Sequence, residues 1–283
     1  MQGLEVYQSL WAMERRVPGE PEAPLEVMLD RIAGAGFDGV CLDLAMSDVP
    51  LAHAARPLMA ARGLKCLLNG FPKCDEELRF MLAMARDFGA PFLSVIGQVM
   101  PRAPEAMIEL AWRWIAIARE EGQPLLFETH RHGLLNDLYP TLGLLEAIPE
   151  LRLCADLSHF VVDREFALPI DDEAQAMMSQ VLDRSWAFQG RIASNEQVQV
   201  QIGFPRQRDW VEQFWRWWAQ GLQSWRARAA ADGVVTFLCE LGPPPYAITG
   251  PDGLELSDRW EEALAIRDRV RTLWASLDAP GVG

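Results

Sequence analysis

The sequence is short of histidine, of paired cysteines and of basic residues. Its 283 residues include four histidines and five cysteines, and 26 basic residues stand against 40 acidic ones, a formal net charge of −14. This balance repels phosphate backbones and anionic membrane surfaces, so we expect neither nucleic acid nor a membrane as a partner. The cysteines form no CxxC pair, and four of the five lie in apolar runs. We therefore expect buried free thiols rather than disulfides or a zinc cluster.

Targeting and membrane-spanning patterns are missing as well. The first residues, MQGLEVYQSLWAMERR, lack the basic-then-apolar order of a signal peptide. No apolar run approaches the length of a bilayer-spanning helix. We therefore expect a cytoplasmic protein. The composition, 50% hydrophobic and 23% charged, is that of an ordinary globular chain with enough length for a sizeable core.

Short apolar runs recur along the chain, and each is followed by a helical pattern. The runs are nearly continuous rather than alternating, which is typical of strands buried on both faces in a parallel sheet. They follow one another at the spacing of strand–helix units of about 30 residues. The eight predicted strands are 4–10, 38–44, 64–71, 91–97, 124–129, 151–157, 186–193 and 234–241.

Eight strands that alternate with helices form either a closed barrel or an open, doubly wound sheet. No GxGxxG or GxxxxGK[ST] follows the first strand, so the usual mark of a nucleotide-binding open sheet is missing. No shift in composition marks a domain boundary. We predict a single (β/α)₈ TIM barrel over residues 1–283, with a disordered tail from about 276 to 283.

Two helical patterns bear on the surface of this barrel. Residues 208–230 carry tryptophans at helical spacing, which predicts a helix packed on the barrel or a subunit interface of a homo-oligomer. His53 lies in the pattern 47–62 and is expected to be exposed.

Acidic and amide side chains stand at the ends of the later strands, where a TIM barrel places its chemistry. Carboxylates that converge in a low-dielectric cavity repel one another, and a divalent cation is the simplest compensation. Oxygen ligands favour Mn²⁺ or Mg²⁺, with Co²⁺ or Zn²⁺ as alternatives. Taken singly, each acid could instead cap a helix or form a surface ion pair. The candidate ligands are Glu128, Asp156, Gln189 and Glu240.

Three of the four histidines, His130, His132 and His159, follow two of these strand ends within four residues. Because histidine is scarce elsewhere, this clustering favours a functional role for His130 and His159. Arg191, close to Gln189, could recognise a carboxylate or phosphate through its planar fork, or pair with a neighbouring acid.

Three segments together resemble the xylose-isomerase-like TIM barrels, the sugar phosphate isomerase/epimerase superfamily. They are FETH at 127–130, D-x-S-H from Asp156 to His159, and CELGPPPY at 239–246. The resemblance covers most of the chain, and its motifs are concentrated in 124–260. It implies a metal held by Glu128, Asp156, a residue of the seventh strand and Glu240.

The seventh strand departs from this pattern. Similar members have H-A-R-V-G followed by P-Q-V, whereas this chain reads QGRIA at 189–193 and EQV at 196–198, with Gln197 matching the glutamine. Gln189 therefore stands where the metal-binding histidine is expected. Its carbonyl oxygen is a weaker transition-metal ligand than imidazole. The change either favours Mg²⁺ or Mn²⁺ at lower affinity or marks a site that has lost its metal.

The resemblance implies an isomerase or epimerase of carbohydrate metabolism that acts on a sugar or a related polyol or keto acid. Glu128 and Glu240 would form the acid/base pair, and a metal would stabilise the enediolate. Asn69, after the third strand, and Gln98, after the fourth, are weaker candidates for the pocket wall. The candidate substrate-binding residues are His159, Arg191, His130, Gln197 and Trp11.

Other functions remain open on the same residues. The resemblance also admits a sugar dehydratase, a hydroxypyruvate-type isomerase or a catalytically inactive barrel that binds a sugar. Abasic-site endonucleases share the fold, but they need more histidines and a basic face. Metal dependence would separate these classes, since an enzyme should need the cation, whereas a binding module would show affinity for its ligand in chelator.

Overall fold

Eight parallel strands close into one barrel in the structure, a computed structural model that describes residues 1–277. Each strand pairs with the next in the sequence, and β8 pairs with β1 to close the sheet. The predicted (β/α)₈ barrel is therefore confirmed. The strands are β1 Gly3–Ser9, β2 Gly39–Leu44, β3 Lys65–Gly70, β4 Leu93–Val95, β5 Leu125–Glu128, β6 Leu153–Ala155, β7 Ser185–Gln189 and β8 Val234–Cys239.

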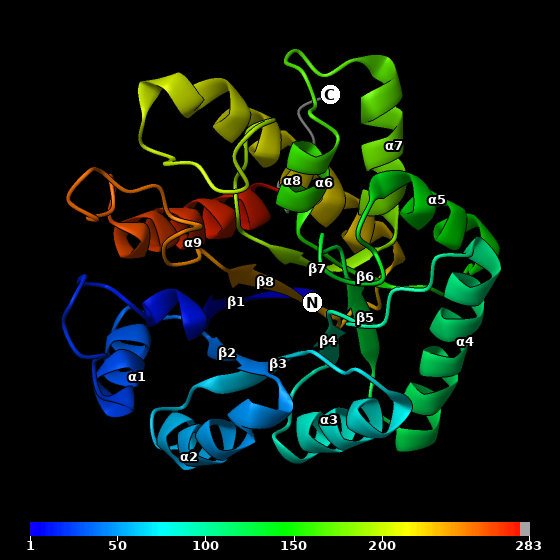
Figure 1. The fold of residues 1–283 in the computed structure, drawn as a ribbon, viewed down its shortest axis with the longest axis horizontal. Coiled ribbons are helices and arrows are strands. Elements are labelled where there is room, and N and C mark those ends of the chain that lie inside the picture. The colour runs from blue at the N-terminus through cyan, green and yellow to red at the C-terminus, as the bar shows by residue number, and fades with distance from the viewer. Residues whose placement is uncertain (278–283) are drawn as a thin grey trace.

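Helices surround the strands on the outside of the barrel (Figure 1). The α-helices are α1 Leu25–Gly34, α2 Val49–Ala60, α3 Asp75–Asp87, α4 Pro104–Glu121, α5 Leu138–Ala147, α6 Leu157–Asp163, α7 Asp172–Asp183, α8 Arg208–Arg228 and α9 Arg259–Ser276. Three short 3₁₀ turns complete the description: η1 Trp11–Met13, η2 Met46–Asp48 and η3 Pro205–Gln207. The rest of the predicted tail, 278–283, lies outside the described residues.

Several strands are shorter than the apolar runs that predicted them. The run 151–157 changes from strand to helix at Asp156, whose side chain accepts a hydrogen bond from the backbone N–H of Ser158 and begins α6. Strand β7 ends at Gln189, so Arg191 lies in the segment after the strand. The prediction that Arg191 lies on the strand was wrong. Both differences arise where an apolar pattern continues past the last strand residue.

Every strand directs side chains into the barrel interior. An apolar layer fills its middle and contains Tyr7, Cys41, Leu67, Phe92, Leu126, Cys154, Ala187 and Leu238. Side chains alternate between the two faces of a strand, so the residue two positions further on lies in the next inward layer. That layer is polar on every strand, and we call it the polar ring: Ser9, Asp43, Asn69, Ser94, Glu128, Asp156, Gln189 and Glu240.

The larger apolar core lies between the barrel and its helices. The tryptophans of α8 belong to it: Trp210, Trp215, Trp217, Trp218 and Trp225 are all buried within the single chain. The helix therefore packs on the barrel, which was one of the two predictions for this segment.

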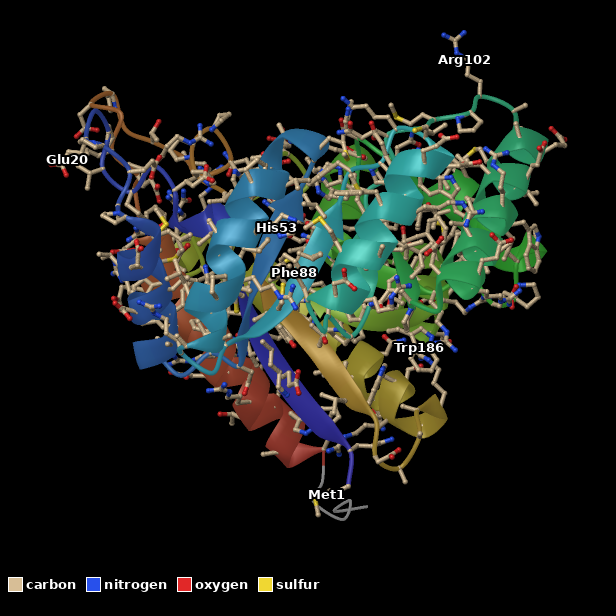
Figure 2. All side chains as sticks on the ribbon, turned by 90° about the horizontal axis from the view of Figure 1, so that it is seen from below. Met1, Glu20, His53, Phe88, Arg102 and Trp186 are labelled. Carbon is tan, nitrogen blue, oxygen red and sulfur yellow. The ribbon has the colours of Figure 1, made fainter. Side chains whose placement is uncertain are left out.

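The structure confirms the predictions of free cysteines and of an exposed His53. All five cysteines are free, and only Cys74 among them is exposed. His53 is exposed on α2, where its ring lies 5.6 Å from that of Phe88 (Figure 2). Among the helices of residues 1–277, none combines the length and the apolar character needed to cross a bilayer.

Candidate active site

The polar ring lies at the C-terminal ends of the strands, which we call the mouth of the barrel. The loops that carry Glu20 and Arg102 follow β1 and β4 and extend at this end, opposite Met1 (Figure 2). All ring residues except Asp43 are buried. The ring therefore gathers the predicted ligands Glu128, Asp156, Gln189 and Glu240 in one enclosed layer.

Arg191 connects two of the ring carboxylates. Its Nε lies 3.0 Å from Asp156 Oδ2, and its Nη2 lies 3.3 Å from Glu240 Oε1. The arginine is 1% exposed. Burial lowers the pKa of Arg191, but the charges of Asp156 and Glu240 outweigh this effect and raise its pKa above the ordinary value. The guanidinium is thus a permanent positive charge inside the mouth.

Both oxygens of Asp156 already have partners. Oδ1 accepts hydrogen bonds from the N–H of Ser158 at 3.0 Å and from its hydroxyl at 2.5 Å. Oδ2 accepts the bond from Arg191 Nε. The sequence motif D-x-S-H therefore fixes the aspartate from the helix side, while the segment after β7 fixes it from the other.

Two aromatic rings flank the guanidinium. The Cζ atom of Arg191 lies 4.7 Å from the ring centre of Tyr246 and 5.7 Å from that of Trp11. These rings meet each other edge to face at 5.2 Å. A Cβ atom on Gly242 would come within 2.4 Å of the Trp11 ring, so the glycine of the GPPPY segment permits this packing. The predicted substrate-binding residue Trp11 thus lies at the site, where its ring is next to the Arg191 guanidinium.

Glu128 and Glu240 are buried acids with raised pKa values. Burial raises the pKa of Glu128 well above its usual range, and the nearby charge of Glu240 adds to the effect. Burial also raises the pKa of Glu240 to about 8, against the lowering effect of Arg191. Ser94 donates to Glu128 through its hydroxyl at 3.2 Å. Carboxyl groups with raised pKa values are suited to general acid–base catalysis.

The two predicted histidines lie together beside Asp156. The rings of His130 and His159 are 4.2 Å apart between centres, and Nε2 of His159 is 3.4 Å from Asp156 Oδ2. Burial lowers the pKa of His130 to about 2, with a further contribution from His159. Burial, together with the charge of Arg191, also lowers the pKa of His159 well below its usual range. Both imidazoles are therefore neutral, and each can donate or accept a hydrogen bond.

Several buried oxygens of the ring have no hydrogen-bond partner. In Gln189 the amide nitrogen donates to Cys154 Sγ at 3.9 Å, which leaves its oxygen free. Hydroxyl groups of a bound ligand could satisfy such atoms, since buried polar groups are normally paired. The unpartnered oxygens are Asn69 Oδ1, Glu128 Oε1, Gln189 Oε1 and Glu240 Oε2.

These donors do not fit the predicted divalent metal. Among residues 1–277, no three His, Cys, Asp or Glu side chains are grouped so that they could hold an ion. Both oxygens of Asp156 already accept hydrogen bonds, from Ser158 and from Arg191. A second cation beside the guanidinium would also be repelled by its charge. No step that follows is therefore assigned to a metal.

Asp43 is a ring residue that the sequence analysis missed. Asn69 donates to its Oδ1 at 3.5 Å, and burial raises the pKa of Asp43 to about 7. It lines a cavity of about 390 Å³ at the mouth, together with Trp11 and Gln98. The signal for Asp43 was its place two residues after the interior Cys41 in the run DGVCLDL.

Gln197 does not join this cluster. It is exposed, and its backbone bonds to Ser194. Gln199, two residues later, is buried and bonds the backbone of Gly242 in both directions, at 2.7 and 3.0 Å. The segment after β7 therefore contacts the GPPPY segment through Gln199.

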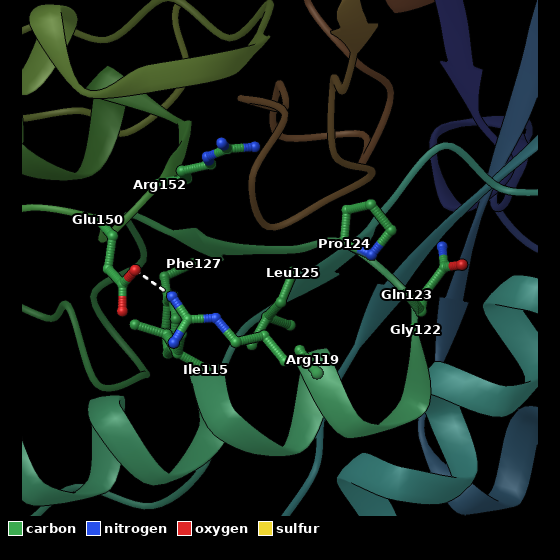
Figure 3. Close-up of a pocket in the computed structure, with 10 residues that line it drawn as sticks. Ile115, Arg119, Gly122, Gln123, Pro124, Leu125, Phe127, Glu150 and Arg152 are labelled. Atoms are coloured by element: carbon green, nitrogen blue, oxygen red, sulfur yellow. Dashed lines mark hydrogen bonds and ion pairs between the residues drawn. The ribbon is translucent and has the colours of Figure 1, made fainter.

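A second hollow lies at the other end of the barrel. It has a volume of about 330 Å³ and lies against α4 and the start of β5, where Arg119 pairs with Glu150 (Figure 3). None of the residues that line it belongs to the polar ring or to the predicted site. The mouth is therefore the better candidate for chemistry.

Known structures share this architecture. No protein-family model and no curated protein matches the chain. A D-allulose 3-epimerase from Methylomonas sp. is similar at a TM-score of 0.60 and 13% identity, over 96% of this chain and 98% of that one. A xylose isomerase-like TIM barrel protein from Mycobacterium smegmatis in complex with magnesium is similar at 0.59 and 14%, over 96% and 97%.

A third similar structure is a probable 3-DHS dehydratase involved in petrobactin synthesis from Bacillus anthracis. Its TM-score is 0.55 at 12% identity, over 93% of this chain and 98% of that one. At such low identity the likeness establishes the fold and leaves the chemistry to the site. The chain therefore has the fold of the xylose isomerase-like TIM barrels, as its motifs indicated.

Proposed function

We propose that the protein is an isomerase or epimerase that moves a proton on a carbon next to a carbonyl group of a sugar-like molecule. The observation that carries this proposal is the pair of buried acids Glu128 and Glu240, both with raised pKa values and both with an unpartnered oxygen in the mouth. Similar folds include an epimerase of a sugar, which agrees with this class of substrate.

The two acids suit proton transfer on two sides of a substrate. β5 and β8 are three steps apart around the closed barrel, so Glu128 and Glu240 approach the mouth from different sides. One carboxylate would take the proton from the carbon, and an enediolate would form as the carbonyl oxygen gains negative charge. The other acid, in its protonated form, would return a proton to the opposite face. For a 1,2-isomerisation, one acid would return the proton to the neighbouring carbon.

Other groups at the mouth would bind and orient the substrate. Neutral His130 and His159, Trp11 and the amide oxygen of Gln189 supply donors, acceptors and an apolar surface at the mouth. This mixture suits a neutral molecule with several hydroxyl groups. Arg191 carries the positive charge that an enediolate oxygen requires.

Proton exchange in heavy water tests the proposal directly. A panel of ketopentoses, ketohexoses and hydroxy keto acids would be incubated with the protein in D₂O, and NMR would follow deuterium entry beside the carbonyl. We expect exchange for one class, with a loss on the order of 10²–10⁴-fold in both Glu128→Gln and Glu240→Gln. The exposed Glu146 provides a matched control, since Glu146→Gln should leave exchange unchanged.

Three results would contradict the assignment. Exchange that persists in both glutamine variants would remove these acids from the reaction. A product with a new double bond would indicate a dehydratase, which the similar Bacillus anthracis structure keeps as the second candidate. Ligand binding without any exchange would indicate a sugar-binding barrel without catalysis.

A further inference from the structure

The polar ring holds several acids, and the guanidinium of Arg191 pairs with two of them. Glu128, Asp156 and Glu240 stand at the ends of β5, β6 and β8, and Asp43 lies on β2. Inside an enclosed layer, such acids need either protons or a cation for compensation. The only cation that contacts this ring among residues 1–277 is the guanidinium of Arg191.

The guanidinium is suited to this place by its shape. It is planar and presents donors in several directions, so it can bond two carboxylates at once. Arg191 does so, with Asp156 at 3.0 Å and Glu240 at 3.3 Å. A divalent ion would need the same two carboxylates as ligands, and the charge of the guanidinium would oppose its binding.

Gln189 is consistent with this arrangement. A histidine at this position would offer a nitrogen ligand to a metal, whereas the glutamine donates through its amide to Cys154. With a guanidinium in the mouth, no metal ligand is required from β7. Gln189 is thus the departure from the family pattern, whereas Arg191 matches the arginine of H-A-R-V-G.

We propose that the Arg191 guanidinium, held between Asp156 and Glu240, is the built-in cation of this barrel and takes the place of a divalent metal. Its Nη1 atom has no hydrogen-bond partner although the side chain is buried. This atom is the donor that would bind a carbonyl oxygen and stabilise the negative charge that develops on it. The ligand class is a neutral polyhydroxy carbonyl compound, and this part rests on the proposed function.

Metal content is the first test. The full chain would be purified without chelator, dialysed, and examined by elemental analysis, and its melting temperature would be recorded with and without Mn²⁺, Mg²⁺, Co²⁺ and Zn²⁺. We expect only traces of metal and no rise in melting temperature, because an ion that binds the folded chain would stabilise it. A stoichiometric metal that is lost in Asp156→Asn would overturn the proposal.

Two variants locate the cation. Gln189→His restores the nitrogen ligand but keeps the guanidinium, so we expect it to remain free of metal. The double variant Gln189→His, Arg191→Met removes the guanidinium, so we expect it to gain stoichiometric Mn²⁺ or Co²⁺ and a higher melting temperature with that ion. Metal uptake by Gln189→His alone, or none by a folded double variant, would contradict the proposal.

The test separates the two proposals. Metal content and melting temperature need no substrate, so the absence of any reaction would leave the assignment of Arg191 intact. Conversely, a metal-bound wild-type protein that still depends on Glu128 and Glu240 would overturn only the role of Arg191. In the wild-type protein, exchange that persists in chelator would support both.

Discussion

The polar ring divides into two arcs of different character. Strands β5–β8 supply Glu128, Asp156, Gln189 and Glu240, with Arg191 beside them, whereas β1–β4 supply Ser9, Asp43, Asn69 and Ser94. The first, which we call the charged arc, holds most of the charge. The second, which we call the neutral arc, is mostly uncharged, and the cavity of about 390 Å³ lies above part of it. Under the proposed function, one arc would supply the reactive groups, while the other would supply space and neutral hydrogen-bond donors.

Among the variants considered, loss of Arg191 should have the largest effect on the stability of the protein. In Arg191→Met, Asp156 and Glu240 lose their shared cation, which should lower the free energy of unfolding by about 3–5 kcal/mol, as for other broken buried ion pairs. The loss should be greater in alkaline than in acidic buffer, because protonation removes the uncompensated charge. Urea unfolding at both pH values measures it.

The exposed Arg102 offers a control for this substitution (Figure 2). Arg102→Met should change the free energy of unfolding by less than about 0.5 kcal/mol. Equal stability of Arg191→Met and wild type at alkaline pH would show that the arc does not depend on this charge.

The pH dependence of stability shows whether Asp43 in the neutral arc is charged in the folded protein. Its pKa is raised from 3.8 to about 7, so between these values the unfolded chain has released a proton that the folded chain keeps. Rising pH therefore lowers the free energy of unfolding across this window, and the penalty is complete above it. Asp43→Asn removes the penalty and should be less sensitive to pH by roughly 3–4 kcal/mol.

Urea unfolding of the two proteins at about pH 4 and about pH 8 would give this difference. The matched control is Asp232→Asn in an exposed turn, which should retain the wild-type slope. A wild-type slope in Asp43→Asn would mean that Asp43 already ionises freely, and the neutral arc would then carry a second permanent charge.

Ser94 joins the two arcs, and its removal should have the smallest effect. Its hydroxyl donates to Glu128 at 3.2 Å, so Ser94→Ala should lower the free energy of unfolding by about 1 kcal/mol. Ser47 makes a serine–carboxyl bond of the same length to Asp48 but is exposed, so Ser47→Ala should cost less. Equal losses in the two variants, measured by thermal unfolding, would show that burial adds nothing to the Ser94 bond.

The charged arc was easier to predict from sequence than the neutral one. Glu128, Asp156 and Glu240 close apolar runs, so each stands out where hydrophobicity stops. Asp43 and Ser94 lie inside their runs and become visible only when inward positions are counted two by two from a known interior residue. That count requires the strand register, which eight hydrophobic runs do not define.

The sequence offered a pair between Arg191 and a neighbouring acid as one of two roles, but it misplaced the arginine. Gly190 and Arg191 continue an apolar run, which predicted that the arginine would lie on the strand, and composition does not show where the chain leaves the sheet. The site of Gln197 was inferred from a motif position, whereas the structure buries Gln199 instead. The barrel itself was predictable, because its eight runs and their spacing repeat one physical unit.

The polar ring also has a consequence for folding. Phe127 precedes Glu128 on β5 and stacks on Trp114 of α4 at 6.4 Å, outside the barrel. If β5 slipped by one residue, Phe127 would turn into the mouth and Glu128 would press against the indole in an apolar layer. A one-residue slip in any other strand would likewise turn its polar ring residue outward into apolar surroundings, which would be unfavourable. The residues that we propose for chemistry in the finished barrel thus also favour, among the alignments of a closing sheet, the native one.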